Sequence, residues 1–177
     1  QPAFDILSAR GAVLKSTPAA GATGAAALSG YILPNAEPFY IRVSGLEGST
    51  PYRLLIDGVE PAALQIGQTV SSTTGGVTFW TLDGQPDQVV QINLDAAEGT
   101  GLDTLLRLLG RDGKEIAYDD DGGAGYNSRL TLILPETPGL LVQADRYEGA
   151  GAFTLSVSKL ATEPLPVDGS SVSFVSD

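Results

Sequence analysis

Residues 88–94 read Gln-Val-Val-Gln-Ile-Asn-Leu, and this alternation of polar and apolar side chains decides the fold class. Successive side chains of a β-strand point to opposite faces of its sheet, so Val90, Ile92 and Leu94 share one face. A period of two predicts a strand with one buried face and one wet face, as in antiparallel sheets.

Short segments of the same kind recur through the second half of the chain, separated by Gly, Pro, Asn or Asp, while helix signals are nearly absent. They cover residues 77–82, 104–109, 114–118, 129–134, 140–145 and 152–158. This pattern is typical of an all-β sandwich or barrel, and the segments suffice for two packed antiparallel sheets.

Composition limits the function classes. The 177 residues carry a net charge of −11, which argues against nucleic acid and anionic membrane surfaces as partners and favours cations. No apolar run is long enough to span a bilayer, so we expect no membrane insertion. The chain begins at Gln1 and has no Met, which indicates either a removed signal peptide or a piece of a longer protein. The acidic, Gly-, Ser- and Thr-rich composition fits a secreted bacterial surface or matrix protein.

The absence of both Cys and His excludes a thiolate nucleophile, a histidine base and the usual zinc sites. Three adjacent aspartates on one loop do not provide an acid and a base on opposite sides of a bond, as a glycosidase requires. We therefore predict no catalytic residues, no organic cofactor and no enzymatic activity.

Residues 117–128 read Ala-Tyr-Asp-Asp-Asp-Gly-Gly-Ala-Gly-Tyr-Asn-Ser. Three adjacent carboxylates repel one another, and either exposure to water or a hard cation relieves the repulsion. Calcium binds six to eight oxygen ligands in flexible geometry, and glycines allow the backbone to fold back around it. The sequence thus predicts either a calcium site or a solvated acidic hairpin loop. An EF-hand loop is excluded, because its third ligand position would be Gly123.

The first sixty residues repeat part of the second half. Pro34 aligns with Pro135, an offset of 135 − 34 = 101, and at the same offset 40–43 aligns with 141–144 and 52–56 with 153–157. After a one-residue gap, residues 4–6 align with 106–108. The repeat begins in the middle of a unit.

The first copy lacks the carboxylates, since Thr17, Pro18 and Ala19 stand in place of Asp119–Asp121. Residues 165–172 resemble 64–70, the start of the complete copy. We therefore expect three parts: an incomplete β unit without the acidic motif (1–60), a complete β-sandwich (62–160), and a linker with a strand-like C-terminal segment (161–177).

Several motifs occur in the order typical of one bacterial family: Gly101-Leu102-Asp103-Thr104, Asp112-Gly113-Lys114-Glu115-Ile116-Ala117, Asp120-Asp121-Gly122-Gly123, Asn127-Ser128-Arg129-Leu130 and Gly151-Ala152-Phe153-Thr154-Leu155. Residues 62–160 resemble the pre-peptidase C-terminal (PPC) domain. The chain resembles one full copy of it, preceded by a partial, degenerate copy.

The resemblance implies a secreted, calcium-binding β-sandwich of jelly-roll type, of the kind appended to exported enzymes. It also implies that Asp103, Asp120 and Asp121 coordinate Ca²⁺, with Asp119 or Asn127 contributing. The alternative for Asp103 is a turn residue that bonds to its own backbone.

Two functional hypotheses remain. The first is a non-catalytic, extracellular, calcium-binding structural module that forms a homo-oligomer or a head-to-tail filament, with the C-terminal segment added as a strand to the incomplete unit of a neighbour. Alternatively, the missing strands belong to a longer protein. The second hypothesis is an adhesion or substrate-targeting module that binds an extracellular polymer, carbohydrate or collagen-like peptide, with aromatic residues such as Trp80, Tyr118, Tyr126 and Tyr147 as contacts.

Overall fold

The structure is a computed structural model that describes residues 2–17, 24–45, 51–73, 76–136 and 138–162. Within these ranges the regular structure consists of β-strands, and no helix could cross a membrane. The twelve strands are β1 (Ala3–Leu7), β2 (Val13–Ser16), β3 (Tyr40–Ser44), β4 (Ala62–Gln65), β5 (Thr69–Thr73), β6 (Thr78–Asp83), β7 (Val89–Ala96), β8 (Asp103–Leu109), β9 (Glu115–Asp119), β10 (Ser128–Ile133), β11 (Leu140–Glu148) and β12 (Ala152–Lys159).

Strands β4 to β12 form two sheets, with the orders β10-β7-β12-β5 and β4-β6-β11-β8-β9. All pairs are antiparallel except β4 with β6. One apolar cluster takes side chains from both sheets and holds them face to face. The predicted all-β antiparallel sandwich is therefore confirmed, and all seven segments predicted as strands are strands.

The alternation in residues 88–94 correctly identifies residues of the core. Val90 and Ile92 are fully buried, and Leu94 is 1% exposed. Strand β12 contributes Phe153, whose ring meets that of Trp80 edge to face, with ring centroids 6.1 Å apart. Because the two aromatic residues come from opposite sheets, this contact joins the sheets at the centre of the core.

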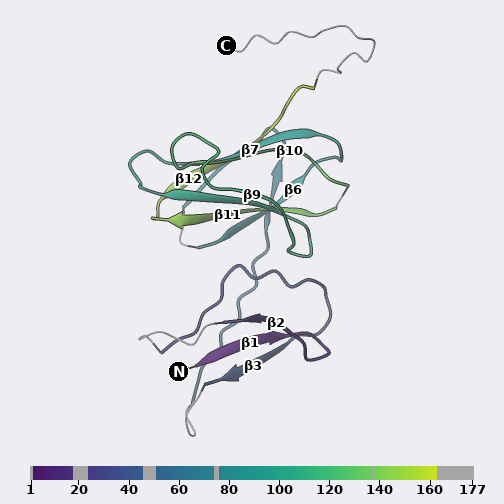
Figure 1. The fold of residues 1–177 in the computed structure, drawn as a ribbon, viewed down its shortest axis with the longest axis vertical. Helices are drawn as coiled ribbons and strands as arrows, with labels where there is room; N and C mark the ends of the chain where they lie inside the picture. The colour runs from purple at the N-terminus through teal and green to yellow at the C-terminus, as the bar shows by residue number, and fades with distance from the viewer. Residues whose placement is uncertain (1, 18–23, 46–50, 74–75, 137, 163–177) are drawn as a thin grey trace.

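The N-terminal residues form a separate three-stranded sheet of order β2-β1-β3. It lies below the sandwich along the long axis of the molecule in Figure 1. Its pairing matches that of β9-β8-β11. Asp5 pairs with Ser16 and Arg42, and its counterpart Arg107 pairs with Tyr118 and Gln143. The offsets are 107 − 5 = 102, 118 − 16 = 102 and 143 − 42 = 101, as in the sequence repeat.

Even the irregularities coincide. The β1–β2 register shifts between Ile6 and Leu7, and the β8–β9 register shifts between Leu108 and Leu109. The turns that follow contain Gly11 (φ +79°) and Gly113 (φ +78°), in the left-handed region that favours glycine. The two three-stranded arrangements therefore share one local design.

The repeat does not extend to every strand. Residues 28–33 and 52–58 align with β10 and β12, yet neither segment is a strand in the structure. In the sandwich β10 pairs with β7, and β12 pairs with β7 and β5. Strand-forming sequence needs a ladder partner, and the described part of the N-terminal unit offers none in these positions.

Residues 57–63, a Pro- and Glu-containing stretch, are expected to be the linker between the two units; in the structure residues 57–61 have no regular structure, but β4 already begins at Ala62, so the linker is two residues shorter than expected. Most of the predicted C-terminal segment, residues 163–177, lies outside the described residues, as do Pro18 and Ala19.

Candidate metal centre

The acidic stretch forms the loop between β9 and β10, and Asp119 ties its two ends together. Asp119 Oδ2 accepts hydrogen bonds from the backbone N–H of Gly122 at 2.8 Å and of Arg129 at 2.7 Å. Hydrogen bonds to an ionised carboxylate are about twice as strong as neutral ones. Asp119 therefore closes the loop.

Two glycines allow the loop to fold back on itself. A Cβ atom on Gly123 would lie 2.6 Å from the carbonyl oxygen of Asn127, and one on Gly122 would lie 2.7 Å from the Asp119 carboxylate oxygens. The side chain of Asn127 points to the neighbouring strand, where its Oδ1 accepts a hydrogen bond from the N–H of Ala96 at 2.9 Å. Asn127 thus fastens the loop to the end of β7.

A buried polar pair fixes the loop to the start of β8. The side chains of Thr104 and Ser128 are fully buried, and their hydroxyl oxygens are 2.7 Å apart. The N–H of Ser128 donates to Thr104 Oγ1 at 2.8 Å, and the N–H of Thr104 donates to the carbonyl of Tyr126 at 3.1 Å. Fully paired buried polar groups rigidify their surroundings, so the position of Asp103 relative to the loop is well defined.

Among the buried side-chain polar atoms of the described residues, Oδ1 of Asp103 is the one without a hydrogen-bond partner. Burial raises the pKa of the Asp103 carboxyl, and the negative charges of Asp121, Asp120 and Glu148 raise it further. Leaving a buried acceptor unpaired costs about 1–3 kcal/mol, so a group that satisfies it would stabilise the fold.

The chemistry of these donors fits a hard cation. Within the described ranges no three acidic residues already lie in an arrangement that would hold a metal ion. However, the unpaired oxygen of Asp103 faces a field made by carboxylates of the acidic loop, and oxygen-only ligands with excess negative charge are what calcium takes. The structure thus brings Asp120 and Asp121 into electrostatic contact with Asp103. One carboxylate oxygen of Asp119 is engaged within the loop, and the side-chain oxygen of Asn127 is engaged by the N–H of Ala96 on β7.

Sequence reasoning missed Glu148. It lies at the end of β11 and pairs with Asp103 after a register shift. Next to it, Gly149 approaches the backbone of Gly101 so closely that a Cβ would overlap the Gly101 carbonyl oxygen. The turn around residues 147–149 was visible in the sequence, but only strand pairing reveals that it meets Asp103.

The N-terminal sheet has an uncharged residue in the place of Asp119. Thr17 stands where Asp119 does, is nearly buried, and its Oγ1 accepts from the N–H of Phe4 and donates to its carbonyl, both at 2.9 Å. The neutral Thr17 hydroxyl bonds to the neighbouring strand β1 and provides no charge for an ion.

No family model and no curated protein matches this chain. A solved structure that matches is the 1.0 Å crystal structure of the pre-peptidase C-terminal domain of collagenase from Bacillus anthracis, at 16% identity and a TM-score of 0.49. The match covers 58% of this chain and 99% of that one. The fold class follows from the strand pairing itself.

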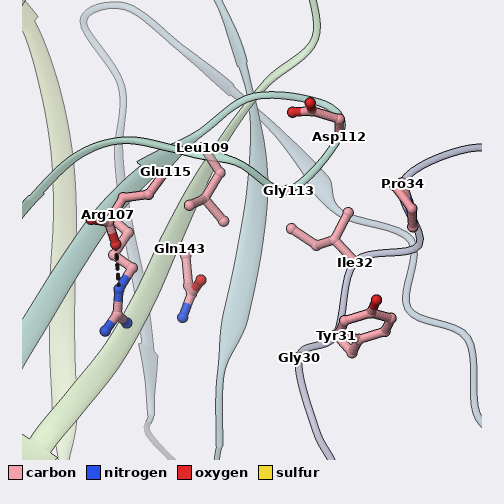
Figure 2. Close-up of a pocket in the computed structure, with 10 residues that line it drawn as sticks. All are labelled: Gly30, Tyr31, Ile32, Pro34, Arg107, Leu109, Asp112, Gly113, Glu115 and Gln143. Atoms are coloured by element: carbon pink, nitrogen blue, oxygen red, sulfur yellow. Dashed lines mark hydrogen bonds and ion pairs between the residues drawn. The ribbon is translucent and has the colours of Figure 1, made fainter. Parts of the chain in front are cut away.

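A pocket of about 300 Å³ lies elsewhere, where the loop around Tyr31 meets the five-stranded sheet (Figure 2). Ile32 lies over Gly113, and Arg107 is held by Glu115 at 3.1 Å. This pocket is an open gap between the two units, and its one guanidinium is already paired with carboxylates.

Of the four aromatic residues considered for ligand binding, Trp80 is part of the core and is only 6% exposed. Tyr118, Tyr126 and Tyr147 are 60%, 69% and 73% exposed. They adjoin Asp119, Asn127 and Glu148 in sequence, so the aromatic residues that could meet a partner lie beside the acidic loop.

Proposed function

We propose that the chain is a non-catalytic, extracellular module whose sandwich is stabilised by Ca²⁺ bound between Asp103 and the acidic loop. The observation that carries this proposal is the buried, unpaired Oδ1 of Asp103 next to the charges of Asp120, Asp121 and Glu148. A divalent cation would satisfy that oxygen and offset the repulsion among these carboxylates.

Each residue has its own part in this arrangement. Asp103, Asp120 and Asp121 supply the ligand oxygens, and Glu148 adds charge from the end of β11. Asp119 and Asn127 hold the loop in shape through their backbone bonds, and Asp119 keeps a second oxygen for the ion. The bound ion would link β8 to the β9–β10 loop, which adds stability because it binds the folded state only.

A structural role agrees with the rest of the chain. The sequence has no His and no Cys, and Asp103, whose pKa is raised, neighbours other carboxylates rather than a base or a nucleophile. Extracellular calcium is abundant enough to fill a site of modest affinity, so we place the module outside the cell.

Adhesion is the second candidate. Tyr118, Tyr126 and Tyr147 are exposed beside the acidic loop, and amphipathic tyrosine side chains suit contacts with sugars or extended peptides. A glycan and peptide array separates the two functions, because a purely structural module gives no selective signal that Tyr126→Ala removes.

A calcium titration of the melting temperature tests the main proposal. At a calcium concentration of about 100 times Kd, mass action adds about 2.7 kcal/mol, which corresponds to about 5–10 °C for a chain of this size. Asp103→Asn should lose most of this gain. The matched control is Asp112→Asn, which changes an exposed aspartate paired with Lys114 on a turn of the same sandwich.

The melting temperature of Asp103→Asn is also informative without calcium. Asp103→Asn removes an unpaired, repelled carboxylate, so in calcium-free buffer its melting temperature should be no lower than that of the unmodified chain. A melting temperature that ignores calcium up to 10 mM, or that rises equally in Asp103→Asn, would contradict the proposal.

A further inference from the structure

The N-terminal sheet and its counterpart in the sandwich differ in what lies on one edge and one face. In the sandwich, β11 pairs with β8 on one edge and with β6 on the other. Its counterpart β3 pairs with β1 and, among the described residues, has no strand on its other edge. An open edge presents unpaired backbone groups to any extended chain that reaches it.

The matching face is incompletely covered as well. Leu106, Leu108, Val142 and Ala144 on β8 and β11 are at most 1% exposed. Their counterparts are all apolar, yet each is only half-buried: Phe4, Ile6, Ile41 and Val43. The face that forms the centre of a core in one unit is therefore partly open in the other.

The same unit holds exposed strand-forming sequence. Residues 52–56 align with β12, and in the structure Leu54, Leu55 and Ile56 are 44%, 68% and 69% exposed. Monomeric proteins rarely leave a contiguous apolar surface uncovered. One added β-strand would both pair with the open edge of β3 and cover part of the apolar face.

The chain contains a sequence that fits this place. Residues 172–176 read Val-Ser-Phe-Val-Ser and share the pattern of residues 77–81, Val-Thr-Phe-Trp-Thr, although the repeat itself aligns Val172 with Val70. Residues 77–81 include most of β6, the strand on the edge of β11, where Trp80 pairs with Val142. Because Val142 corresponds to Ile41 (142 − 41 = 101), the same register would set Val175 opposite Ile41. Val175 would then face the apolar side of the sheet, and Val172 and Phe174 would lie on its outer face, as Val77 and Phe79 do relative to Trp80.

The geometry of the molecule indicates which copy supplies the strand. Residues 160–162 leave the sandwich at the end of the long axis opposite to the N-terminal sheet (Figure 1). Fifteen more residues, 163–177, follow in the sequence, and fifteen fully extended residues can span about 50 Å, which is enough to reach a neighbouring molecule. A neighbouring molecule is the natural acceptor.

We propose that the open edge of β3 is a docking site for residues 171–177 of a second copy of this chain, added antiparallel with Val175 opposite Ile41. Main-chain hydrogen bonds give such a contact its strength, and the alternating side chains give it its register. Donor and acceptor are different surfaces at opposite ends, so the contact is head-to-tail and extends into a chain of molecules.

Hydrogen exchange on the unmodified protein gives the first test. The outward amides of β3 should become at least ten-fold slower to exchange as the concentration rises from micromolar to millimolar, while those on the outer edge of β2 stay unchanged. Asp103→Asn should show the same protection, because this contact is independent of the calcium proposal.

Cross-linking gives the second test, which is clean because the chain has no Cys. Copies carrying Ile41→Cys are mixed under mild oxidation with isotope-labelled copies carrying Val175→Cys. Mixed disulfide dimers should form at least ten-fold more than with Val13→Cys, an exposed site on β2 at the other edge of the same sheet.

Three results would overturn the proposal. One is a monomer whose β3 amides exchange equally at every concentration, whether fast or protected. Another is equal cross-linking of Val13→Cys and Ile41→Cys with Val175→Cys. The third is an intramolecular disulfide in a chain that carries both Ile41→Cys and Val175→Cys, because the strand would then come from the same copy.

Discussion

Two regions of this molecule share the same local strand pairing and differ in how far their inner faces are buried. The β2-β1-β3 sheet and the β9-β8-β11 part of the sandwich have the same order, the same register and a register shift at the same step. Only the sandwich buries its inner face, where Leu106 and Leu108 are inaccessible to solvent. The difference shows that local strand pairing survives with half of a core, but burial requires the opposing sheet.

The two regions also treat the residue that closes the loop differently. Asp119 binds two backbone N–H groups and carries charge into the acidic loop, whereas Thr17 satisfies Phe4 with a neutral hydroxyl. The complete unit therefore retains mutually repelling carboxylates, and a bound cation would offset their repulsion. The N-terminal sheet instead has an unfinished apolar face.

The largest expected effect tests burial at equivalent positions. Leu108→Ala should destabilise the sandwich by about 3 kcal/mol, because it leaves a cavity in a close-packed core. Ile6→Ala, at the matching position of the half-open sheet, should cost about 1 kcal/mol. Urea unfolding followed by Trp80 fluorescence reports on the sandwich, and amide exchange of Asp5 reports on the sheet. Equal losses would mean that the two faces are equally buried in solution.

A smaller effect concerns the matched turns. Gly11→Ala and Gly113→Ala should each cost about 1 kcal/mol, since both positions have a positive φ that alanine adopts poorly. Gly113→Ala should cost more, because its Cβ would lie 3.1 Å from that of Ile32, while the space at Gly11 is open. Urea unfolding followed by Trp80 fluorescence gives the loss for Gly113→Ala, and amide exchange of Asp5 gives the loss for Gly11→Ala. A larger loss at Gly11 would contradict the contact between the two units.

The smallest effect is the pH dependence of the calcium-free sandwich. The pKa of Asp103 is raised in the folded state, so this state holds the proton more tightly than the unfolded chain does. Ionised Asp103 therefore weakens the fold at neutral pH, and the penalty disappears as the pH falls through the raised pKa, above the ordinary value of 3.8. The melting temperature should rise as the pH is lowered from 7 towards the raised pKa of Asp103.

Calcium should reverse this slope, because protons then compete with the ion. Asp103→Asn should flatten both profiles, and the N-terminal sheet, which has Thr17 in the place of Asp119, should show neither. The lowered pKa values of Asp5, bonded to Ser16 and Arg42, and of Asp112, bonded to Lys114, affect stability only at more acidic pH. A calcium-free melting temperature that falls as the pH is lowered from 7 towards the raised pKa would contradict the assignment of Asp103.

The sequence by itself determined strands β6 to β12, the faces of β6, β7, β10 and β12, and the offset of the repeat, because alternation is a local property of a strand. It also marked the acidic loop as unusual. Only the tertiary structure decided that Asp103 keeps an unpaired oxygen, that Asp119 and Asn127 hold the loop, and that Glu148 faces Asp103. It alone decided that residues 28–33 and 52–58 do not form strands. These outcomes depend on which segments become neighbours across a sheet, and residues far apart in sequence meet only once the chain has folded.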